Sequence, residues 1–489
     1  MEFESVIGLE VHVQIKTRTK IFCGCPTTFG GEPNSQICPV CAGYPGVLPV
    51  LNRKVVRELA RTALALKARV NSHSIFARKQ YFYPDLPKNY QISQYELPLA
   101  EKGELSFTLD GQTRTIGIHR IHLEEDAGKL LHAVGNKALN HTLVDLNRTG
   151  VPLMEIVSEP DLRTPEEASE YLSTLRTRLR YLDVSDCNME EGTMRCDANV
   201  SIRPRGQTSL GTKAEIKNMN SFKAVRDALS HEIRRQEQAV QAGERIVQET
   251  RLWDAARGVT ISMRSKEEAH DYRYFPEPDL VPIHLDAAAL EDLRKTIPEM
   301  PEQKRARYAD QWGLSAYDVN VLTENPSLSG YYEETLTSSW PSEQQAEAAK
   351  PVANWVTTDL LGRLNAEHID PADSPLTPAR LGELVMLIQD GVISGKIAKT
   401  VFDEMWTTGR AAKDIVQAKG LVQVTDEGAI ARWADEVISA NEKAAREYRE
   451  GNERAIGALV GAVLKKSAGK ANPQLVNKIL REKLSSKPS

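Results

Sequence analysis

Long apolar runs are absent from this sequence of 489 residues. No stretch approaches the roughly 18 consecutive apolar residues of a membrane-spanning helix, and the opening segment MEFESVIGLEVHV has no basic stretch before its apolar part. A large excess of one charge is also missing, and the net charge of -5 excludes a protein that coats nucleic acid by bulk charge. We therefore expect a cytoplasmic protein that binds no membrane and no DNA, with any RNA contact confined to one region.

Several catalytic motifs are missing as well. The sequence has no G-x-x-x-x-G-K-[ST] segment, so bound ATP would not use that phosphate-binding loop. It also has no G-x-S-x-G motif, and no cysteine with a suitable histidine partner outside one cysteine cluster. The chain therefore shows no means of hydrolysing an amide by itself.

Cysteine is scarce, yet four of the six cysteines lie close together. Cys23 and Cys25 form a C-x-C pair, and Cys38 and Cys41 form a C-x-x-C pair after a loop rich in Gly and Pro. Two such pairs can each hold one edge of a tetrahedral Zn²⁺ ion, and four thiolates leave no open position, so the predicted zinc is structural. Four reduced thiols are the alternative, because disulfides do not suit a chain without a secretion signal.

The chain is too long for one ordinary hydrophobic core, and its pattern changes twice. Residues 1–292 mix short alternating strands with helices and include the cysteine loop at 23–41. Residues 293–408 have helical periodicity with few strand signals, and residues 409–489 are helical and end in a basic stretch. We expect an α+β fold with a large N-terminal domain, an all-α connector and an all-α tail domain.

Helix boundaries are marked in three places. The segment 163–182 has Thr164 as N-cap, Pro165 at the first helical position and Glu167 placed for a capping box. The segment 220–243 ends at Gly243, and the segment 377–405 begins with Thr377 as its cap. These signals predict a helix in each of the first two segments and helical periodicity from Thr377 onward in the third.

Three segments alternate polar and apolar residues with the period of a strand. In LEVHVQI, Glu10 and His12 share the polar side, and in RCDANVSIR, Arg195, Asp197 and Asn199 do. In VTISMR, the polar side begins with Thr260 and opposes the apolar residues. Such alternation is typical of antiparallel strands with one apolar and one polar face.

The polar faces are rich in residues that bind metals and phosphates, although solvated surface is the plainer interpretation of each strand taken singly. The acidic, amide and imidazole members are Glu10, His12, His122, Glu124, Asp197, Asn199 and Glu215, with Lys79, Arg148 and Arg195 among the basic residues beside them. Carboxylates bind Mg²⁺, and arginines and lysines stabilise phosphoryl oxygens. In HLEEDAGK the alternation separates Glu124 from Glu125, so we expect at least one of the two to join the site.

A family resemblance is carried by many long motifs in one order. They include VIGLEVHVQIKTRTKIFCGC, CPVCAGYPGVLPVLN, ARKQYFYPDLPKNYQISQYELPLA, HLEEDAGK, VDLNRTGVPLMEIVSEPDLRTPEEA, EEGTMRCDANVSIRP, TKAEIKNMNSF and DYRYFPEPDL. Together with LVQVTDEGAI and GKANPQLVNKIL near the end, they make the whole chain resemble the B subunit of the aspartyl/glutamyl-tRNA(Asn/Gln) amidotransferases.

The resemblance implies a heterotrimer with an amidase-type A subunit and a small C subunit. The A subunit would release ammonia from glutamine, and the B subunit would use ATP to activate the side-chain carboxylate of misacylated Asp-tRNA(Asn) or Glu-tRNA(Gln). The implied fold is an antiparallel sheet similar to that of glutamine synthetases. The implied Mg²⁺ and ATP site matches Glu10, His12, Glu124 or Glu125, Asp197 and Glu215, with Lys79 in an associated motif. Some relatives lack the four cysteines, so zinc remains an interpretation of this chain alone.

The last segment is the candidate tRNA-binding element. Between residues 465 and 489 there are seven lysines and arginines and one glutamate, and we assign tRNA contacts to Lys465, Lys466, Lys470 and Lys478. A solvated helix face is the alternative for this stretch.

Two other functions are weighed against the ligase. A non-catalytic tRNA-binding scaffold would support the A subunit without using ATP. A small-molecule amide ligase or guanidino kinase could use the same sheet but has no need of the basic tail. The series of motifs favours the tRNA-dependent ligase over both.

Overall fold

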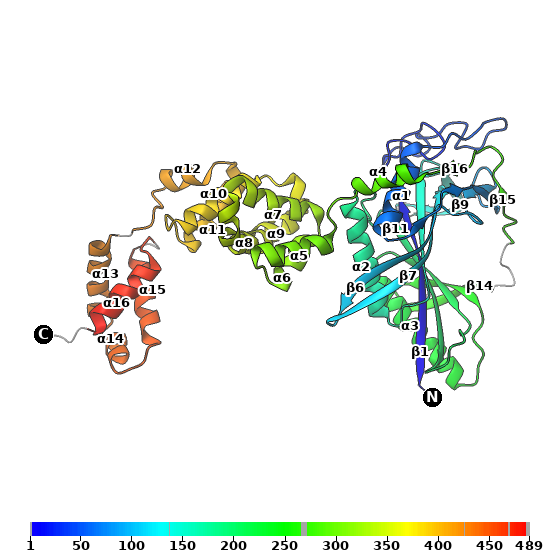
Figure 1. The fold of residues 1–489 in the computed structure, drawn as a ribbon. Coiled ribbons are helices and arrows are strands. Elements are labelled where there is room, and N and C mark those ends of the chain that lie inside the picture. The colour runs from blue at the N-terminus through cyan, green and yellow to red at the C-terminus, as the bar shows by residue number, and fades with distance from the viewer. Residues whose placement is uncertain (1, 136, 266–270, 425, 468–469, 486–489) are drawn as a thin grey trace. The chain divides into compact units, whose positions relative to one another are not determined.

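The computed structural model describes residues 2–135, 137–265, 271–424, 426–467 and 470–485. The chain divides into two compact units, Met1–Pro301 and Glu302–Ser489. The first unit is a mixed α/β body built on a large sheet, and the second is helical (Figure 1). Within these described ranges, no helix has both the length and the apolar character needed to cross a bilayer.

A nine-stranded sheet forms the centre of the first unit. Its strands, in spatial order, are β14 (Val259–Ser265), β13 (Glu249–Asp254), β12 (Ala214–Met219), β11 (Met194–Pro204), β1 (Phe3–Gln14), β10 (Pro152–Ser158), β7 (Gln112–Glu125), β6 (Ala100–Leu109) and β2 (Arg69–Val70). Neighbouring strands run antiparallel except β12 and β13, which are parallel. The first strand of the chain is therefore central and joins segments that lie far apart in sequence.

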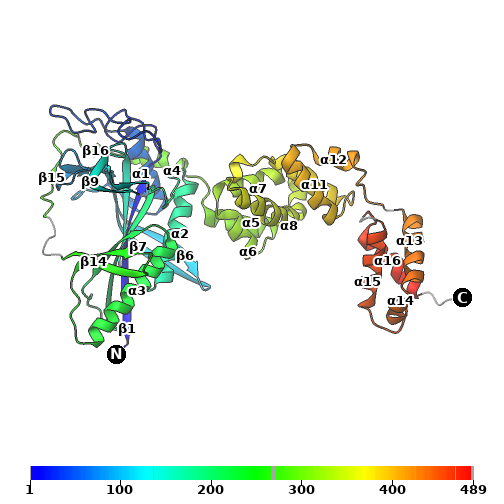
Figure 2. The same cartoon turned by 180° about the vertical axis from the view of Figure 1, so that it is seen from behind.

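Apolar side chains cover one face of this sheet. Leu9, Val11 and Val13 of β1 belong to one buried cluster with Ile121 and Leu123 of β7. The helices α1 (Arg53–Ala65), α2 (Pro165–Tyr181) and α3 (Phe222–Gln241) contribute to the same cluster, and α4 (Ala287–Lys295) packs against α1. Figure 2 shows the sheet and these helices from behind. Because side chains alternate along a strand, the polar residues of β1 and β11 lie on the opposite face.

Short strands make three smaller sheets. The three-stranded sheet has the order β15 (Phe275–Pro276), β4 (Ala77–Gln80) and β5 (Tyr90–Ser93). The two-stranded sheets pair β16 (Ile283–His284) with β3 (His73–Ser74), and β8 (Lys129–Val134) with β9 (Lys137–Asp145). Strand β5 contacts β7, so the three-stranded sheet lies beside the part of the large sheet where β7 ends at Glu124 and Glu125.

The helix signals of the first unit are confirmed with one change in detail. The Thr164 hydroxyl accepts a hydrogen bond from the Glu167 N–H at 3.0 Å, and Pro165 is the first residue of α2. The Glu167 carboxylate, however, accepts from the N–H of Arg163 at 2.7 Å rather than from the N-cap residue. Gly243 follows the end of α3 with φ of 79°, the left-handed conformation expected of a terminating glycine.

The predicted orientation of strand β14 is wrong. Thr260 is buried and donates to the Glu232 carboxylate of α3 at 2.8 Å, whereas Ile261 and Met263 are exposed. A buried carboxylate on α3 reverses the usual preference, because Thr260 supplies one of the hydrogen bonds that it needs. Alternation therefore identified the strand but not which of its faces is covered.

The second unit contains two separate hydrophobic clusters. The first gathers side chains between Tyr308 and Val416, and the second gathers side chains between Ile430 and Leu484. The first set of helices is α5 (Pro301–Trp312), α6 (Ala316–Thr323), α7 (Pro326–Ser339), α8 (Gln345–Asn354), α9 (Leu361–Glu367), α10 (Pro378–Gln389), α11 (Gly395–Thr408) and α12 (Ala412–Ala418). The second set is α13 (Glu427–Ala440), α14 (Glu442–Arg449), α15 (Ala455–Lys466) and α16 (Pro473–Ser485).

Short helical segments join some of these helices. A π-helical stretch, Trp355–Leu360, continues α8 into α9, and short 3₁₀ turns occupy Ser342–Gln344 and Pro371–Asp373. The helical periodicity predicted over 377–405 is confirmed, with Thr377 as the N-cap residue, and it belongs to two helices, because α10 ends at Gln389 and α11 starts at Gly395. Gly391 lies between them with φ of 67°, a left-handed conformation that ends the first helix, and Ser394 caps the second.

Candidate functional site

Four strands bring polar side chains into one row. The pairing register places His12 of β1 opposite Glu155 of β10 on one side and Arg195 of β11 on the other. Glu155 in turn lies opposite His122 of β7. All four side chains share the face that points away from the hydrophobic core, because the apolar neighbours of each one lie in that core. The alternation in β1 and β11 thus produces one continuous polar surface.

His12, Glu124 and Glu155 form the tightest group on this surface. One ligand atom from each lies within 4.8 Å of the others. The Nε2 atom of His122 is 3.1 Å from Glu155 Oε2 and 3.4 Å from Glu124 Oε1, while His12 Nε2 is 3.7 Å from Glu155 Oε2. An imidazole and two buried carboxylates can hold a divalent cation. We call these three residues the cation group, with His122 as the partner that orients both carboxylates.

The charges of the cation group depend on one another. Burial opposes ionisation of Glu124, but Lys79 and His122 outweigh it and hold the pKa of Glu124 well below its usual range. Burial acts in the same way on Glu155, yet His122 lowers the pKa of Glu155 to about 2. Burial disfavours the imidazolium, but Glu155 and Glu124 raise the pKa of His122 to about 9. Both carboxylates are therefore anionic at neutral pH, as cation binding requires.

Glu124 and Glu125 point to different partners. The Glu124 carboxylate accepts hydrogen bonds from Gln91 at 3.1 Å and Ser93 at 2.7 Å, both on β5. Glu125 is buried and forms an ion pair with the partly buried Lys88. Of the two glutamates that the sequence left open, the structure brings only Glu124 into the cation group.

Three further residues assigned to the metal lie beside the cation group. Glu10 is opposite Asp197 in the register, and Glu215 is opposite Asn199. The ammonium of Lys217 pairs with Asp197 and lies 2.9 Å from Glu215 Oε1, while Asn199 Nδ2 donates to Glu10 Oε1 at 2.9 Å. The structure therefore gathers Glu10, Asp197 and Glu215 around a lysine. Within the described residues, these three do not offer ligand atoms that all lie within 4.8 Å of one another.

Their pKa values follow from these contacts. Burial raises the pKa of Glu10, and the nearby carboxylates of Glu155 and Glu215 raise it further. Burial opposes ionisation of Glu215, but Lys217 outweighs it and lowers the pKa of Glu215. A cation bound nearby would act against this shift of Glu10, because a positive charge favours the ionised carboxylate.

Lys79 of β4 carries a positive charge that acts on Glu124 of the cation group. Its Nζ atom lies 5.0 Å from the centre of the Tyr272 ring. Burial favours the neutral amine, but the carboxylates of Glu124 and Glu155 outweigh it and raise the pKa of Lys79. Lys79 is therefore an ammonium beside the cation group.

The side chains of Arg148, which precedes β10, and of Arg195 on β11 meet at Asp126, in the turn after β7. Arg195 Nη2 donates to Asp126 Oδ1 at 3.0 Å. Arg148 Nε is 3.7 Å from the same oxygen, and its guanidinium donates to the carbonyls of Ala127 at 2.9 Å and Gly128 at 2.6 Å. The Asp126 carboxylate thus contacts both guanidinium groups and positions them at the edge of the polar surface.

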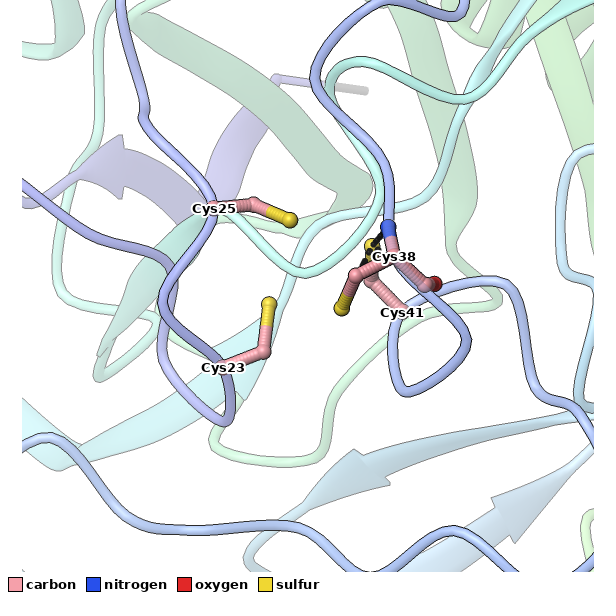
Figure 3. A group of neighbouring side chains, drawn as sticks. All are labelled: Cys23, Cys25, Cys38 and Cys41. Carbon is pink, nitrogen blue, oxygen red and sulfur yellow. Dashed lines mark hydrogen bonds between the residues drawn. The ribbon is translucent and has the colours of Figure 1, made fainter.

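The four predicted thiol ligands come together. Figure 3 shows the sulfur atoms of Cys23 and Cys25, from one stretch of loop, turned toward those of Cys38 and Cys41 from another. One ligand atom from each lies within 4.8 Å of the others, and the sulfurs of Cys38 and Cys41 are 3.9 Å apart. A tetrahedral zinc site with Zn–S bonds of about 2.3 Å has sulfurs about 3.8 Å apart. The cluster therefore fits a structural metal such as Zn²⁺.

The thiols of the cluster differ in how readily they lose a proton. A hydrogen bond from the Cys23 thiol lowers the pKa of Cys41 to about 4, and Cys41 Sγ also accepts from the Cys38 N–H at 3.2 Å. Burial raises the pKa of Cys25 to about 11. Cys41 is therefore the thiol of the cluster that loses its proton most readily.

The assigned tRNA-contacting lysines lie on α15, on α16 and in the loop between them. Lys466 pairs with Glu436, and Lys478 lies 3.7 Å from Glu427. Lys465 is exposed at the end of α15, and Lys470 precedes α16. Helix α13 therefore offsets part of the positive charge that the sequence assigned to this stretch, and Lys487 lies outside the described residues.

Sequence reasoning missed Glu155 and Lys217. Glu155 is the single acid in the apolar strand PLMEIVS, and Lys217 shares a strand face with Glu215. The same alternation that selected Glu10 and His12 could have selected both. Glu155 lies between the buried residues Met154 and Ile156, and Lys217 alternates with the buried Ile216 on the same side as Glu215.

Comparisons with known proteins point in one direction. The family model of the "GatB/GatE catalytic domain" matches residues 5–291, and that of the "GatB domain" matches residues 342–484. Proteins named as the B subunit of aspartyl/glutamyl-tRNA(Asn/Gln) amidotransferase align over 99% of this chain. One such relative, from Carboxydothermus hydrogenoformans, is 56% identical to this chain, and the match covers 99% of the relative. Another, from Moorella thermoacetica, is 55% identical and is covered over its full length. A third, from Geobacter sulfurreducens, is 54% identical over its full length.

Proposed function

Because the chain belongs to the B-subunit family of the aspartyl/glutamyl-tRNA(Asn/Gln) amidotransferases, we propose that it activates the side-chain carboxylate of misacylated Asp-tRNA(Asn) or Glu-tRNA(Gln) with ATP. A carboxylate oxygen attacks the γ-phosphorus of ATP and ADP leaves, giving an acyl phosphate. Ammonia then attacks the acyl carbon, and phosphate leaves as the amide forms. Glutamine is the proposed donor of that ammonia, which makes the reaction an ATP-dependent carbon–nitrogen ligation.

The cation group is the observation that supports this proposal most. His12, Glu124 and Glu155 offer ligand atoms within 4.8 Å of one another on a polar sheet face lined with further carboxylates. These three would hold Mg²⁺, with Glu10, Asp197 and Glu215 beside them as further oxygen donors toward the ATP. Mg²⁺ bound there would offset the negative charge that gathers as the γ-phosphoryl group meets the carboxylate.

The basic residues have separate roles in the proposal. Lys79, kept protonated beside Glu124, would contact the oxygens of the transferred phosphoryl group. Arg148 and Arg195 would contact phosphate from the edge of the site, where Asp126 holds them. Glu125, paired with Lys88, lies apart from the cation group, so its assignment to Mg²⁺ has less support than that of Glu124.

The other modules would serve substrate binding and assembly. We propose that residues 1–292 form the catalytic domain, with a sheet similar to that of glutamine synthetases, and that residues 293–408 form the connector. Residues 409–489 would bind tRNA, because this part carries fifteen lysines and arginines against ten acids in a chain whose net charge is -5. The A subunit would supply ammonia and the C subunit would complete a cytoplasmic heterotrimer.

The test uses the assembled complex with ammonium chloride in place of glutamine. We expect ATP-dependent conversion of Asp-tRNA(Asn) or Glu-tRNA(Gln) to the amide, so that activity no longer depends on the amidase reaction. Glu10→Ala and Asp197→Ala should lower this rate strongly, while Asp186→Ala, which changes an exposed acid paired with Lys16, should not. Amidation that proceeds without ATP, or full activity in both site variants, would leave only a tRNA-binding scaffold.

A further inference from the structure

Lys20 is a fully buried lysine next to the cysteine cluster. It is 1% exposed, and its Nζ atom lies 3.6 Å from the sulfur of Cys41. The same ammonium donates to the carbonyl of Gln36 at 2.7 Å and lies 3.4 Å from the carbonyl of Leu146. Its three hydrogen-bond positions are thus directed at one sulfur and two backbone oxygens.

A buried ammonium needs a compensating negative charge. Among the described residues, no carboxylate oxygen lies within 4.0 Å of Lys20 Nζ, and the backbone carbonyls that it contacts carry only partial charge. An unpaired buried charge costs several kcal/mol, as an order of magnitude. Among the contacts of Lys20 in the described residues, the Cys41 sulfur is the one atom that can carry a full negative charge, as a thiolate.

The metal-bound cluster would need a positive charge just as much. One Zn²⁺ ion with four thiolates carries two net negative charges, and Cys41 is buried. Hydrogen bonds from N–H groups draw electron density from thiolates, and partners of this kind tune metal affinity. The Cys38 N–H and the Lys20 ammonium both approach the same sulfur.

From these contacts we propose that Lys20 is a positioning residue of the thiolate metal site. Its charge reduces the net charge of a zinc-loaded cluster from two negative charges to one. Its contacts also fix the loop between the two cysteine pairs, at Gln36, to the segment before β10, at Leu146. This proposal concerns the metal site alone and stands apart from the proposed reaction.

The experiment compares Lys20→Met with Lys16→Met in the full-length chain. Both changes remove one lysine charge, but Lys16 is half exposed and pairs with Asp183 and Asp186 away from the thiols. Zinc affinity is measured by competition with a chromophoric chelator, and Co²⁺ replaces zinc as a spectroscopic probe. We expect Lys20→Met to weaken zinc binding about 10- to 100-fold, the usual range for partners of metal ligands, and Lys16→Met to leave it unchanged.

The Co²⁺ spectrum separates a direct effect on the sulfur from a loss of folding. Removing the N–H donor raises the energy of the sulfur lone pair, so the sulfur-to-cobalt charge-transfer band should move to longer wavelength. If Lys20→Met does not fold, Lys20→Gln retains a donor for the carbonyls without the charge, and its zinc affinity should still fall. Affinity within twofold of Lys16→Met together with an unshifted band would overturn the proposal. Failure of the wild-type chain to bind Co²⁺ or Zn²⁺ would overturn it as well.

Discussion

Glu155→Gln is the substitution that tests the cation group most directly. The change keeps the shape of the side chain and one oxygen donor but removes a buried negative charge beside His12 and Glu124. In this structure Glu155 also pairs with His122 at 3.1 Å. The variant should therefore bind a divalent cation more weakly and release the constraint on the imidazole.

The size of the effect follows from the charges. For a divalent cation about 2.1 Å from a carboxylate oxygen, the Coulomb energy is about 4 kcal/mol even with the dielectric constant of water. The amide oxygen recovers part of this attraction, so we expect a net loss of about 2–3 kcal/mol. That loss corresponds to roughly 30- to 150-fold weaker binding.

Two measurements check this expectation. Mn²⁺ binding to the chain, followed by electron paramagnetic resonance, reports the affinity. Glu159→Gln is the control, because the Glu159 side chain is 45% exposed and forms an ion pair with the exposed His119. In the ammonium-dependent assay, Glu155→Gln should require more Mg²⁺ for half-maximal rate. In the metal-free protein, the pKa of His122 should fall from about 9 toward its ordinary value, because one of the two carboxylates that raise it is gone.

Unchanged Mn²⁺ affinity in Glu155→Gln would refute the reasoning. So would a reduced rate that no concentration of Mg²⁺ improves while Mn²⁺ binding stays intact, because the defect would then lie outside cation binding. An equal fall in affinity in the Glu159→Gln control would show that the loss of a negative charge just beyond β10 is enough, and it would refute the specific role of Glu155.

Three further predictions concern other parts of the chain. Burial opposes ionisation of Glu232, but its hydrogen bonds to Arg235 and other neighbours outweigh burial and lower the pKa of Glu232. The Glu232 carboxylate therefore stabilises the fold at pH values above its ordinary pKa of about 4.5, and this stabilisation is lost as the pH falls. Glu232→Gln should cost about 3 kcal/mol at pH 7, and in urea unfolding its deficit against wild type should shrink toward pH 3; a constant deficit would contradict this. Cys38→Ser should lose the bound zinc found by elemental analysis, whereas Cys187→Ala should keep it. Deleting residues 409–489 should raise the KM for tRNA with little change in that for ATP, and a selective loss of ATP binding would count against the tail as the tRNA module.

The sequence identified features whose physical cause is local. The spacing of Cys23, Cys25, Cys38 and Cys41 indicated a four-sulfur cluster, because a thiol pair separated by one or two residues can reach one ion wherever the loop lies. Alternation in β1 and β11 predicted a polar face that contains Glu10, His12 and Asp197, because side chains alternate in any strand. The helix cap at Thr164 was equally clear, since it depends on residues within one turn.

Other features depended on which segments meet. Nothing near Glu155 in the sequence shows that His12 and His122 lie on either side of it, because only the register of β10 with β1 and β7 decides that. The face of β14 was mistaken because Glu232, on a helix, attracts Thr260 inward. The sequence count for the C-terminal stretch did not include its neighbours, because only the fold brings Glu436 and Glu427 of α13 to Lys466 and Lys478.

By itself, then, the sequence determined the residue types, the strand and helix periods and the order of motifs that places this chain in its family. Only the tertiary structure decided that Glu124 rather than Glu125 joins His12, and that Lys217 lies among the remaining carboxylates. The physical reason is that periodicity follows from the backbone of each segment, whereas the partner of a charged side chain follows from the pairing of that segment with another part of the chain.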